Sequence, residues 1–231
     1  MKYKLPRPVF TPILRRIISR ELRKQKFTFL KACKQTLKEL ALVSKAIESK
    51  GLPHYLICKK LPHHLGRGIF LHPNADPILK GHAIASYSGE VSLIRQSEPD
   101  DGSYAFTPLM EIHLTREEQS LFDKAGPYRS QRLYALKIDA MKGGNLTRFI
   151  NHSEKPNVRA DIISIPRNAY GLTPAAVEIV YTAKRTIHPG EQLLVSYEAG
   201  GKSYWRALNI KPFPMTAKTL HLNKALKIIE K

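Results

Sequence analysis

Two segments about forty residues apart contain the side chains with the clearest chemistry in this chain. The first, 148–157, includes the neighbours Asn151 and His152, whose amide and imidazole offer several hydrogen-bonding points to a polar small molecule. The second, 190–197, begins with a Gly-Glu turn, continues as an apolar stretch and ends in Tyr197. A stretch of this kind can deliver a phenol to the mouth of a buried site. Each segment alone is weak evidence, and the information lies in their combination.

The charge of the chain is strongly positive and unevenly distributed. Its 231 residues have a net charge of +19, and 42% of them are hydrophobic, which is enough for a packed core and argues against a disordered tail. Residues 1–50 contain fourteen Lys or Arg against three Glu, a net +11. Such a segment attracts polyanions such as DNA, RNA or an acidic protein surface. A solvated amphipathic helix on a basic protein is the other interpretation.

The cysteine content and the hydropathy limit the function classes. Neither Cys33 nor Cys58 has Cys or His neighbours at metal-ligand spacing. We therefore expect reduced thiols and no metal site, structural zinc included. No apolar run approaches the roughly 18 residues that a membrane span requires. The basic N-terminus lacks the apolar region of a Sec-type signal peptide, although other export routes leave no such mark.

Helical periodicity dominates the first fifty residues. Apolar residues separated by Lys and Arg predict two helices, or one bent helix, over about 12–49, and Gly51 and Pro53 end the pattern. The apolar stripe of such helices must be buried. It therefore packs either against the main domain or against a second copy of the chain, so a homodimer is one of the two outcomes.

From residue 54 the pattern changes to short β-type runs separated by Gly and Pro. The capping box 115–118 and the Gly-Pro stop that follows predict one helical insert over about 115–126. A basic C-terminal helix is expected over about 216–229. Together these elements indicate a mixed, β-dominated fold. The expected strands cover residues 55–58, 68–71, 83–87, 90–94, 133–138, 158–165, 177–181 and 193–197.

Four motifs follow one another along this β-rich part: Gly66-Arg67-Gly68-Ile69-Phe70, Tyr87-Ser88-Gly89-Glu90, residues 134–139 with 144–153, and residues 190–197. Each has an ordinary explanation on its own, as a turn, a hairpin corner, an Asx-type turn or the start of a strand. In this order and spacing, over about 54–205, they resemble the motifs of the SET-domain protein-lysine methyltransferases. The resemblance is greatest to the small bacterial, chlamydial-type SET proteins.

This resemblance implies a fold and a division of the chain. The implied fold is the SET-domain β-clip, in which several small sheets surround a pseudoknot of the third and fourth motifs, flanked by N- and C-terminal helices. Residues 1–53 are then a basic helical segment, 54–198 the SET domain and 199–231 a C-terminal lid and helix. Many relatives close the cofactor site with zinc-binding cysteines, one of them where Glu154 stands here. Without them, the lid must come from residues 199–231.

The resemblance also implies a cofactor, S-adenosyl-L-methionine, and the residues that bind it. The backbone of Gly66-Arg67-Gly68 is expected to lie along the cofactor, where missing side chains permit close approach. Asn151 and His152 are expected to bond its amino-acid and adenine ends. Tyr197 is expected where the methyl donor meets the target lysine, with its hydroxyl fixing the amine or stabilising the departing charge.

Four further residues have two roles open, and a fifth, Val195, is expected in the substrate channel. Tyr87 and Tyr134 either line the lysine channel or are core aromatics. Val195 replaces an aromatic that often controls how many methyl groups fit, so the methylation state cannot be read from the sequence. Trp205 either packs on the adenine or anchors the tail to the core. Arg148 either braces its loop, which we favour, or contacts the cofactor.

The predicted function is that of an S-adenosylmethionine-dependent protein-lysine N-methyltransferase acting on histones or on histone-like, nucleic-acid-associated basic proteins. A basic enzyme should repel such substrates, unless Glu90, Asp139 and Glu191 make the cleft locally acidic or nucleic acid bridges the two proteins. The rival is a catalytically inactive SET-fold protein that binds nucleic acid or chromatin through its N-terminal segment. Resemblance implies a bacterial cytoplasmic location, with secretion into a host cell and its nucleus as a further expectation, and no membrane partner.

Overall fold

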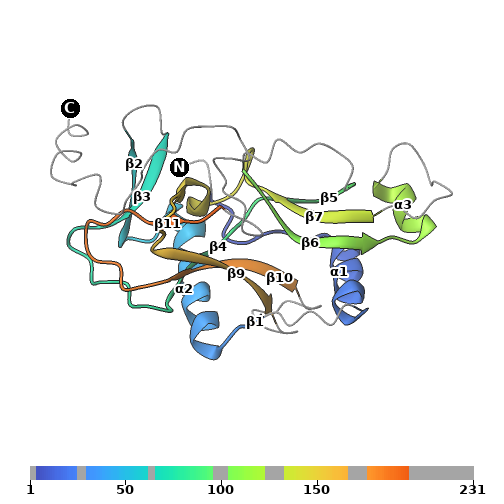
Figure 1. Ribbon diagram of the computed structural model, residues 1–231, viewed down its shortest axis with the longest axis horizontal. Helices are drawn as coiled ribbons and strands as arrows, with labels where there is room; N and C mark the ends of the chain where they lie inside the picture. Colours follow the sequence, from blue (N-terminus) through green and yellow to red (C-terminus); the bar gives the residue numbers. More distant parts are fainter. Residues whose placement is uncertain are drawn as a thin grey trace.

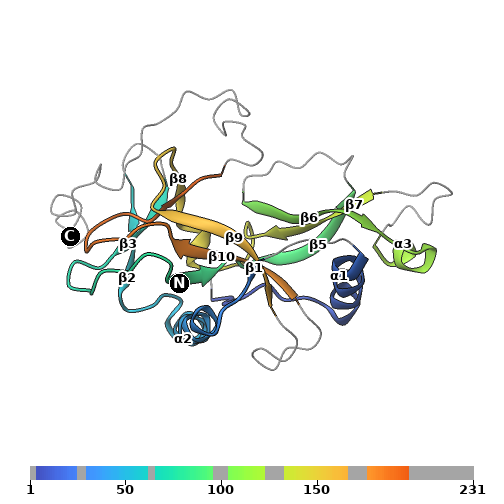
Figure 2. The ribbon, with the colours of Figure 1, turned by 60° about the horizontal axis from the view of Figure 1, so that its bottom comes forward.

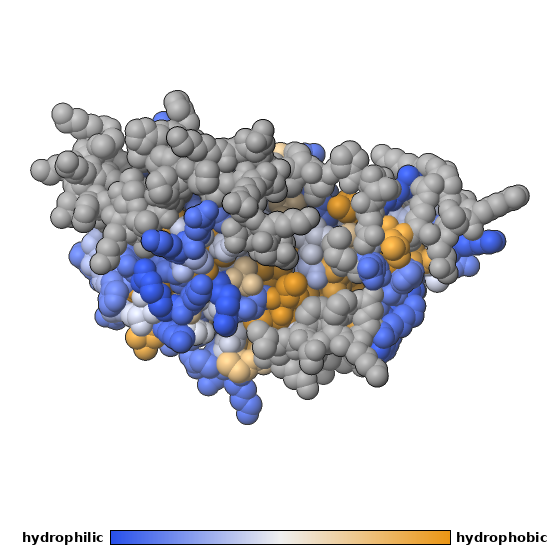
Figure 3. Space-filling view, in the orientation of Figure 1, coloured by the Kyte–Doolittle hydropathy of each residue, from blue (hydrophilic) through white to orange (hydrophobic). Residues whose placement is uncertain are grey.

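The computed structural model describes residues 4–24, 30–61, 66–95, 104–122, 133–165 and 176–197. Within these ranges the chain forms four small β-sheets and three α-helices, so the predicted β-dominated mixed fold is confirmed. The hairpin of β2 and β3 lies at one end of the molecule and α3 at the other, in both views of the ribbon (Figures 1 and 2). Figure 3 shows that the described surface on one face is mostly hydrophilic, with an apolar patch near its middle.

The helices predicted over 12–49 and 115–126 are present, as are most predicted strands, whereas the predicted C-terminal helix lies outside the described residues. The helices are α1 (Pro12–Lys24), α2 (Lys34–Lys50) and α3 (Arg116–Phe122), with a short 3-10 helix η1 (Leu146–Phe149). The strands are β1 (Leu30–Lys31), β2 (Leu56–Lys60), β3 (Arg67–Leu71), β4 (Ala83–Ser86), β5 (Glu90–Arg95), β6 (Ala105–His113), β7 (Leu133–Asp139), β8 (Asn151–His152), β9 (Val158–Ile165), β10 (Ala176–Ala183) and β11 (Leu194–Val195). The sheet orders are β1-β9-β10-β4, β5-β7-β6, β2-β3 and β11-β8.

Strand β6 is absent from our sequence prediction, and its geometry gives the reason. It pairs with β7, but the register shifts twice, between Phe106 and Leu109 and again between Leu109 and Ile112. Glu111, between the last two, has a φ of 62°, which is unusual for a residue other than glycine. These bulges place the inward-facing apolar residues three apart instead of two. A period of three has no strand signature, so the alternation test fails here.

The apolar stripe of α1 packs on the β-rich part of the same chain. Leu14, Ile17 and Ile18 are at most 2% exposed and share a hydrophobic cluster with Leu109 and Leu136 of the β6–β7 pair. Of the two outcomes that the periodicity allowed, packing against the main domain is the one observed for this helix. Burial of the stripe therefore needs no second copy of the chain.

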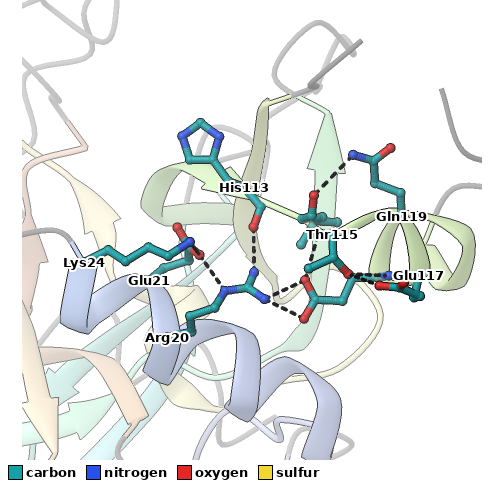
Figure 4. A network of polar contacts seen from close by, with 9 residues as sticks. Arg20, Glu21, Lys24, His113, Thr115, Glu117 and Gln119 are labelled. Atoms are coloured by element: carbon teal, nitrogen blue, oxygen red, sulfur yellow. Dashed lines mark hydrogen bonds and ion pairs between the residues drawn. The ribbon is translucent and has the colours of Figure 1, made fainter. Parts of the chain in front are cut away.

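Polar contacts fix the same helix to β6 and α3 (Figure 4). Arg20 makes two 2.8 Å hydrogen bonds to the Glu118 carboxylate and another, of 2.6 Å, to the His113 carbonyl oxygen. Glu118 also accepts the Thr115 N–H at 3.0 Å and so completes the predicted capping box of α3. Glu118 and Glu21 are buried, and charge-assisted bonds to Arg20 offset the cost of removing them from water.

Helix α2 packs against β4 and has recognisable ends. Cys33 is its N-cap, with Sγ accepting the Thr36 N–H at 3.4 Å, and Gly51 ends it with a φ of 79°. Its apolar face, with Leu40, Val43 and Ile47, is buried. This face is also covered by the main domain, so α1 and α2 together flank the sheets as the sequence predicted.

The extended segment before α1 is tied to the loops that carry the second and third motifs. The Leu5 N–H donates to the Gly144 carbonyl oxygen at 3.0 Å, and the Leu5 carbonyl oxygen accepts from Ser88 Oγ at 2.5 Å. Arg7 forms an ion pair with Glu178, which is 2% exposed. The basic N-terminal region is therefore an integral part of the scaffold behind the motifs and is more than a charged appendage.

Candidate active site

The third and fourth motifs are joined strand to strand. β8 and β11 pair in parallel, with Leu194 opposite Asn151 and Val195 opposite His152. The Ser153 N–H continues the ladder by donating to the Val195 carbonyl oxygen at 2.9 Å. Two segments about forty residues apart in sequence therefore form one unit, as the predicted pseudoknot requires.

Asn157, at the end of the third motif, locks this unit together. It is 0% exposed, its Nδ2 donates to the Gln192 carbonyl oxygen at 2.8 Å, and its Oδ1 accepts the Leu194 N–H at 2.8 Å. Our sequence analysis assigned it no role. A Pro-Asn pair following Asn-His-Ser was the available signal, since a side-chain amide can replace a missing strand partner.

Tyr197 is held at both its backbone and its hydroxyl. Its N–H donates to His152 Nδ1 at 2.9 Å, and its hydroxyl donates to the Ile150 carbonyl oxygen at 2.8 Å. The two rings lie 5.4 Å apart between centroids. Because Nδ1 accepts, the neutral imidazole carries its proton on Nε2. His152 is 3% exposed, so its contact with Tyr197 fixes the backbone that presents the phenol.

Asn151 connects this unit to the first motif. Its Nδ2 donates to the Arg67 carbonyl oxygen at 2.8 Å, and its side chain is half-buried like that of Tyr197. The structure thus brings Arg67, Asn151 and Tyr197 together from three different motifs. The segments that carry Asn151 and Tyr197 are therefore adjacent, and the cofactor cavity that they were expected to share stays a prediction.

The two glycines of the first motif have different structural requirements. Gly66 has a φ of 73°, and a Cβ built on it would meet no atom within 4 Å. At Gly68 an added Cβ would lie 2.6 Å from Gln192 Nε2. Gly66 is therefore required by its backbone conformation and Gly68 by its neighbour. Gly66 is exposed, so the backbone at this end of the motif is open to an approaching molecule.

Tyr87 and Tyr134 occupy different hydrophobic clusters. Tyr87 shares one with Val195 and Tyr197, its ring lies 4.8 Å from that of Phe106, and its hydroxyl donates to the Tyr104 carbonyl oxygen at 2.6 Å. Tyr134 lies in the cluster beneath α1, which does not include Tyr197. Tyr87 is thus near the candidate site, whereas Tyr134 has the surroundings of a core residue.

Tyr181 is a further aromatic residue of the site that our sequence analysis passed over. It is 1% exposed, and its ring centroid lies 6.1 Å from that of Tyr87. Burial, and then the proximity of Tyr197 and Tyr87, raise its pKa well above the ordinary value. Its sequence signal was hidden because a buried tyrosine in an apolar strand is indistinguishable from core.

Arg148 braces the loop before β8. Its guanidinium lies 4.5 Å from the centroid of the Tyr104 ring and 5.2 Å from that of Phe149. Its Nη1 donates to the Met141 carbonyl oxygen at 3.1 Å. These contacts correspond to the bracing role that we favoured over cofactor contact.

The acidic residues expected to attract a basic substrate are largely engaged. Burial opposes ionisation of Glu191, but hydrogen bonds from Arg185 and from the His188 N–H hold its pKa below the ordinary value. Asp139 lies 3.2 Å from Lys137 Nζ, and only Glu90 is exposed. These three carboxylates are thus a weak basis for a negative cleft.

Some predictions cannot be placed. Trp205, the C-terminal helix and the rest of the lid segment 199–231 lie outside the described residues.

Across the described ranges, no three His, Cys, Asp or Glu side chains are grouped closely enough to hold a metal ion. In the same part of the chain, no helix is long and apolar enough to cross a membrane.

Comparison with known proteins identifies the class. The family profile described as SET domain matches residues 66–198, which is more than half of the chain. The chain belongs to the SET domain family. The finer resemblance to chlamydial-type proteins stays a prediction.

Curated relatives carry histone-lysine methyltransferase names. "Histone-lysine N-methyltransferase, H3 lysine-9 specific SUVH1" of Nicotiana tabacum is 31% identical over 122 residues, covering 53% of this chain and 16% of that protein. The H3 lysine-4 specific enzyme of Schizosaccharomyces pombe is 28% identical over 131 residues, covering 57% of this chain and 11% of that protein. The chain thus spans only a small part of the length of these relatives.

Solved structures agree on the fold. The SET domain of ATXR5 in complex with histone H3 superposes with a TM-score of 0.52 at 21% identity, covering 79% of this chain and 74% of that chain. At this identity the likeness is one of fold. SET methyltransferases as a class use S-adenosylmethionine as the methyl donor.

Proposed function

We propose that this protein is an S-adenosylmethionine-dependent protein-lysine N-methyltransferase that acts on histones or histone-like basic proteins. The observation that carries the proposal is the meeting of Asn151, His152 and Tyr197 in the β8–β11 unit of a SET domain. The histone-lysine methyltransferase names of the relatives support both the reaction and the substrate class.

In the proposed reaction the protein mainly positions the cofactor and the target lysine and removes them from water. When bound, S-adenosylmethionine supplies an electrophilic methyl group. The target amine must lose a proton first, which costs roughly 4–5 kcal/mol at neutral pH from a reference pKa of about 10.4. The buried rings of Tyr87 and Tyr181 beside Tyr197 provide a low-dielectric wall that lowers the pKa of an amine placed against it. The Tyr197 hydroxyl, fixed by Ile150, provides a polar point at which the amine is oriented.

The cofactor residues fit this reaction. The backbone at Gly66 is exposed, and Asn151 is anchored through its amide on the carbonyl oxygen of the next residue, Arg67. We assign Gly66-Arg67-Gly68, Asn151 and His152 to cofactor binding, with Trp205 from the lid segment as a further contact.

The test is methyl transfer from labelled S-adenosylmethionine to a histone or a histone-like protein. We expect Tyr197→Phe to lower incorporation at least about 100-fold, because a positioned hydroxyl contributes that much to related group transfers. Tyr104→Phe is the control, since it removes the hydroxyl of a 41% exposed tyrosine and keeps the ring beneath Arg148. Undiminished incorporation by Tyr197→Phe would remove Tyr197 from this role.

A second candidate function is nucleic-acid or chromatin binding by a catalytically inactive SET fold. The outer faces of the N-terminal helices favour it, because Arg16 and Arg23 on α1 and Lys34, Lys38 and Lys45 on α2 are exposed. Calorimetric titration with S-adenosylmethionine separates the two, since an inactive scaffold of this kind should show no saturable uptake.

The proposal also includes a chlamydial-type origin, secretion into a host cell and its nucleus, and a homodimer. Light scattering tests the homodimer.

A further inference from the structure

A hollow of about 800 Å³ lies between α2, the residues before β2 and the residues between β3 and β4. Its position is set by the β2–β3 hairpin. Tyr55 and His72, which line it, are joined at one end of the hairpin by a 2.8 Å hydrogen bond, whereas Gly66-Arg67-Gly68 lies at the other end. The hollow is thus separate from the candidate active site, and its volume is in the range of sites that bind ligands.

Its walls combine apolar side chains with two acidic groups and three histidines, His54, His72 and His82. Val43 and Ile78 contribute to the apolar surface, and Leu42, 69% exposed, lies at the rim on the outer face of α2. Glu39 and Asp76 are the acidic residues. Among the described residues that line it there is no Lys or Arg, although the chain has 38 Lys and Arg against 19 Asp and Glu. The sign of the charge here is therefore opposite to that of the molecule as a whole.

The Glu39 carboxylate is held in place. One oxygen accepts the Ala83 N–H at 2.7 Å, and the other lies 2.9 Å from His82 Nδ1. Burial, and then the Glu39 charge, raise the pKa of Tyr55 to about 12, so the phenol stays neutral and adds no charge to the hollow. Asp76 adds an exposed carboxylate at the edge.

We infer that this hollow docks a lysine- or arginine-rich segment of a protein substrate, with an aliphatic residue against the apolar wall and a cation facing Glu39 and Asp76. This inference rests on the proposed function and names a second contact for the same substrate. An acid-lined hollow repels nucleic acid and attracts basic peptides, so charge complementarity selects this occupant. It also offsets locally part of the repulsion that a basic enzyme would otherwise exert on a basic substrate.

The register of the hairpin limits where the docking segment lies in the substrate. From the Tyr55–His72 level to the Lys60–Arg67 pair the strands rise roughly 15 Å. An extended peptide needs at least about five residues to cover this distance. The docked residues therefore lie at least about five positions from the lysine that is methylated.

Fluorescence anisotropy tests the docking without any cofactor. The probes are a fluorescein-labelled peptide of alternating Lys and Leu and the same peptide with Glu in place of Lys. We expect the parent to bind the first and not the second, and Asp76→Lys to weaken binding about tenfold or more. Glu48→Lys, an equal charge reversal at an exposed residue of α2 outside the hollow, should weaken it less than about twofold. Equal weakening by both variants would overturn the inference, because only the overall charge would then matter.

Ala46→Phe, which fills the hollow from α2, provides a steric test. A variant with parent-like circular dichroism and unchanged peptide affinity would also overturn the inference, and if it does not fold the charge reversal decides alone. Failure of the proposed function is seen separately, as absence of S-adenosylmethionine binding in calorimetry. Peptide affinity that depends on Asp76 in the presence of cofactor uptake supports both proposals.

Discussion

Two buried side-chain amides that belong to neighbouring residues of the fold, Asn157 and Gln192, have opposite surroundings. Both Asn157 and Gln192 are 0% exposed, and the Asn157 side chain donates to the backbone of Gln192 itself. Asn157 uses both ends of its amide, whereas within the described residues neither Oε1 nor Nε2 of Gln192 has a hydrogen-bond partner. Asn157 therefore contributes hydrogen bonds to the stability of the β8–β11 unit, whereas the side chain of Gln192 contributes none within the described residues.

Lys59 lies on the same side of the β2–β3 hairpin as the Gln192 side chain. It stands opposite Gly68 in the β2–β3 register, and residues opposite each other in antiparallel strands project to the same side. Gly68 in turn faces Gln192 Nε2. Lys59 is 5% exposed, and its Nζ finds no partner among the described residues. An ammonium and an amide on one face, both removed from water, carry an unrecovered desolvation cost.

The largest effect on stability is expected at Asn157, whose side-chain amide has hydrogen-bond partners at both ends. Asn157→Leu removes two hydrogen bonds and leaves the Leu194 N–H and the Gln192 carbonyl oxygen buried without them. We expect the free energy of unfolding to fall by about 3 kcal/mol, measured by urea denaturation. Cofactor binding should weaken as well, because β11 loses its tie to the third motif. A loss below about 1 kcal/mol would show that Asn157 is not the lock of this unit.

Sequence patterns predicted much of this architecture, and where they failed the cause was physical. Periodicity located α1 and α2 because each has one continuous buried stripe, whereas α3 was located by its capping box. It missed β6, since two bulges replace its alternation with a period of three. The two-residue strands β8 and β11 are too short for any periodic signal.

The site was predictable only in part for a similar reason. The motif order indicated that Asn151 and Tyr197 would meet. The bond from the Tyr197 N–H to His152 Nδ1 was not predictable, because it depends on a parallel register between β8 and β11. Roles that need three-dimensional neighbours, such as that of Tyr181, cannot be recovered from residue type alone.

A smaller effect of opposite sign is expected at Gln192. Gln192→Met keeps the approximate shape of the side chain and removes its amide. The stability should stay the same or rise by up to about 1 kcal/mol, because no hydrogen bond within the described part of the chain is lost. Urea midpoints of this variant beside Asn157→Leu compare the two amides directly. Destabilisation by more than about 1 kcal/mol would mean that a group outside the described residues satisfies Gln192.

An effect on stability of similar size, and the only one that depends on pH, is expected at Lys59. Burial lowers the pKa of Lys59 from its ordinary value of 10.5, so the folded state binds its proton less tightly than the unfolded state does. Stability therefore rises with pH between the lowered pKa and 10.5, where the unfolded chain holds the proton and the folded chain has released it. Lys59→Met removes this dependence and should stabilise the protein by about 1 kcal/mol at neutral pH. The gain should shrink as the pH approaches 10.5.

Lys60→Met is the matched control, because the neighbouring Lys60 is exposed. It should leave both the stability and its pH dependence close to those of the parent. Thermal unfolding of the three proteins between neutral pH and pH 10.5 makes the comparison. If Lys59→Met proves less stable than the parent at neutral pH, the Lys59 ammonium must have a compensating anion. The interpretation that Lys59 and Gln192 are buried without hydrogen-bond partners would then be wrong.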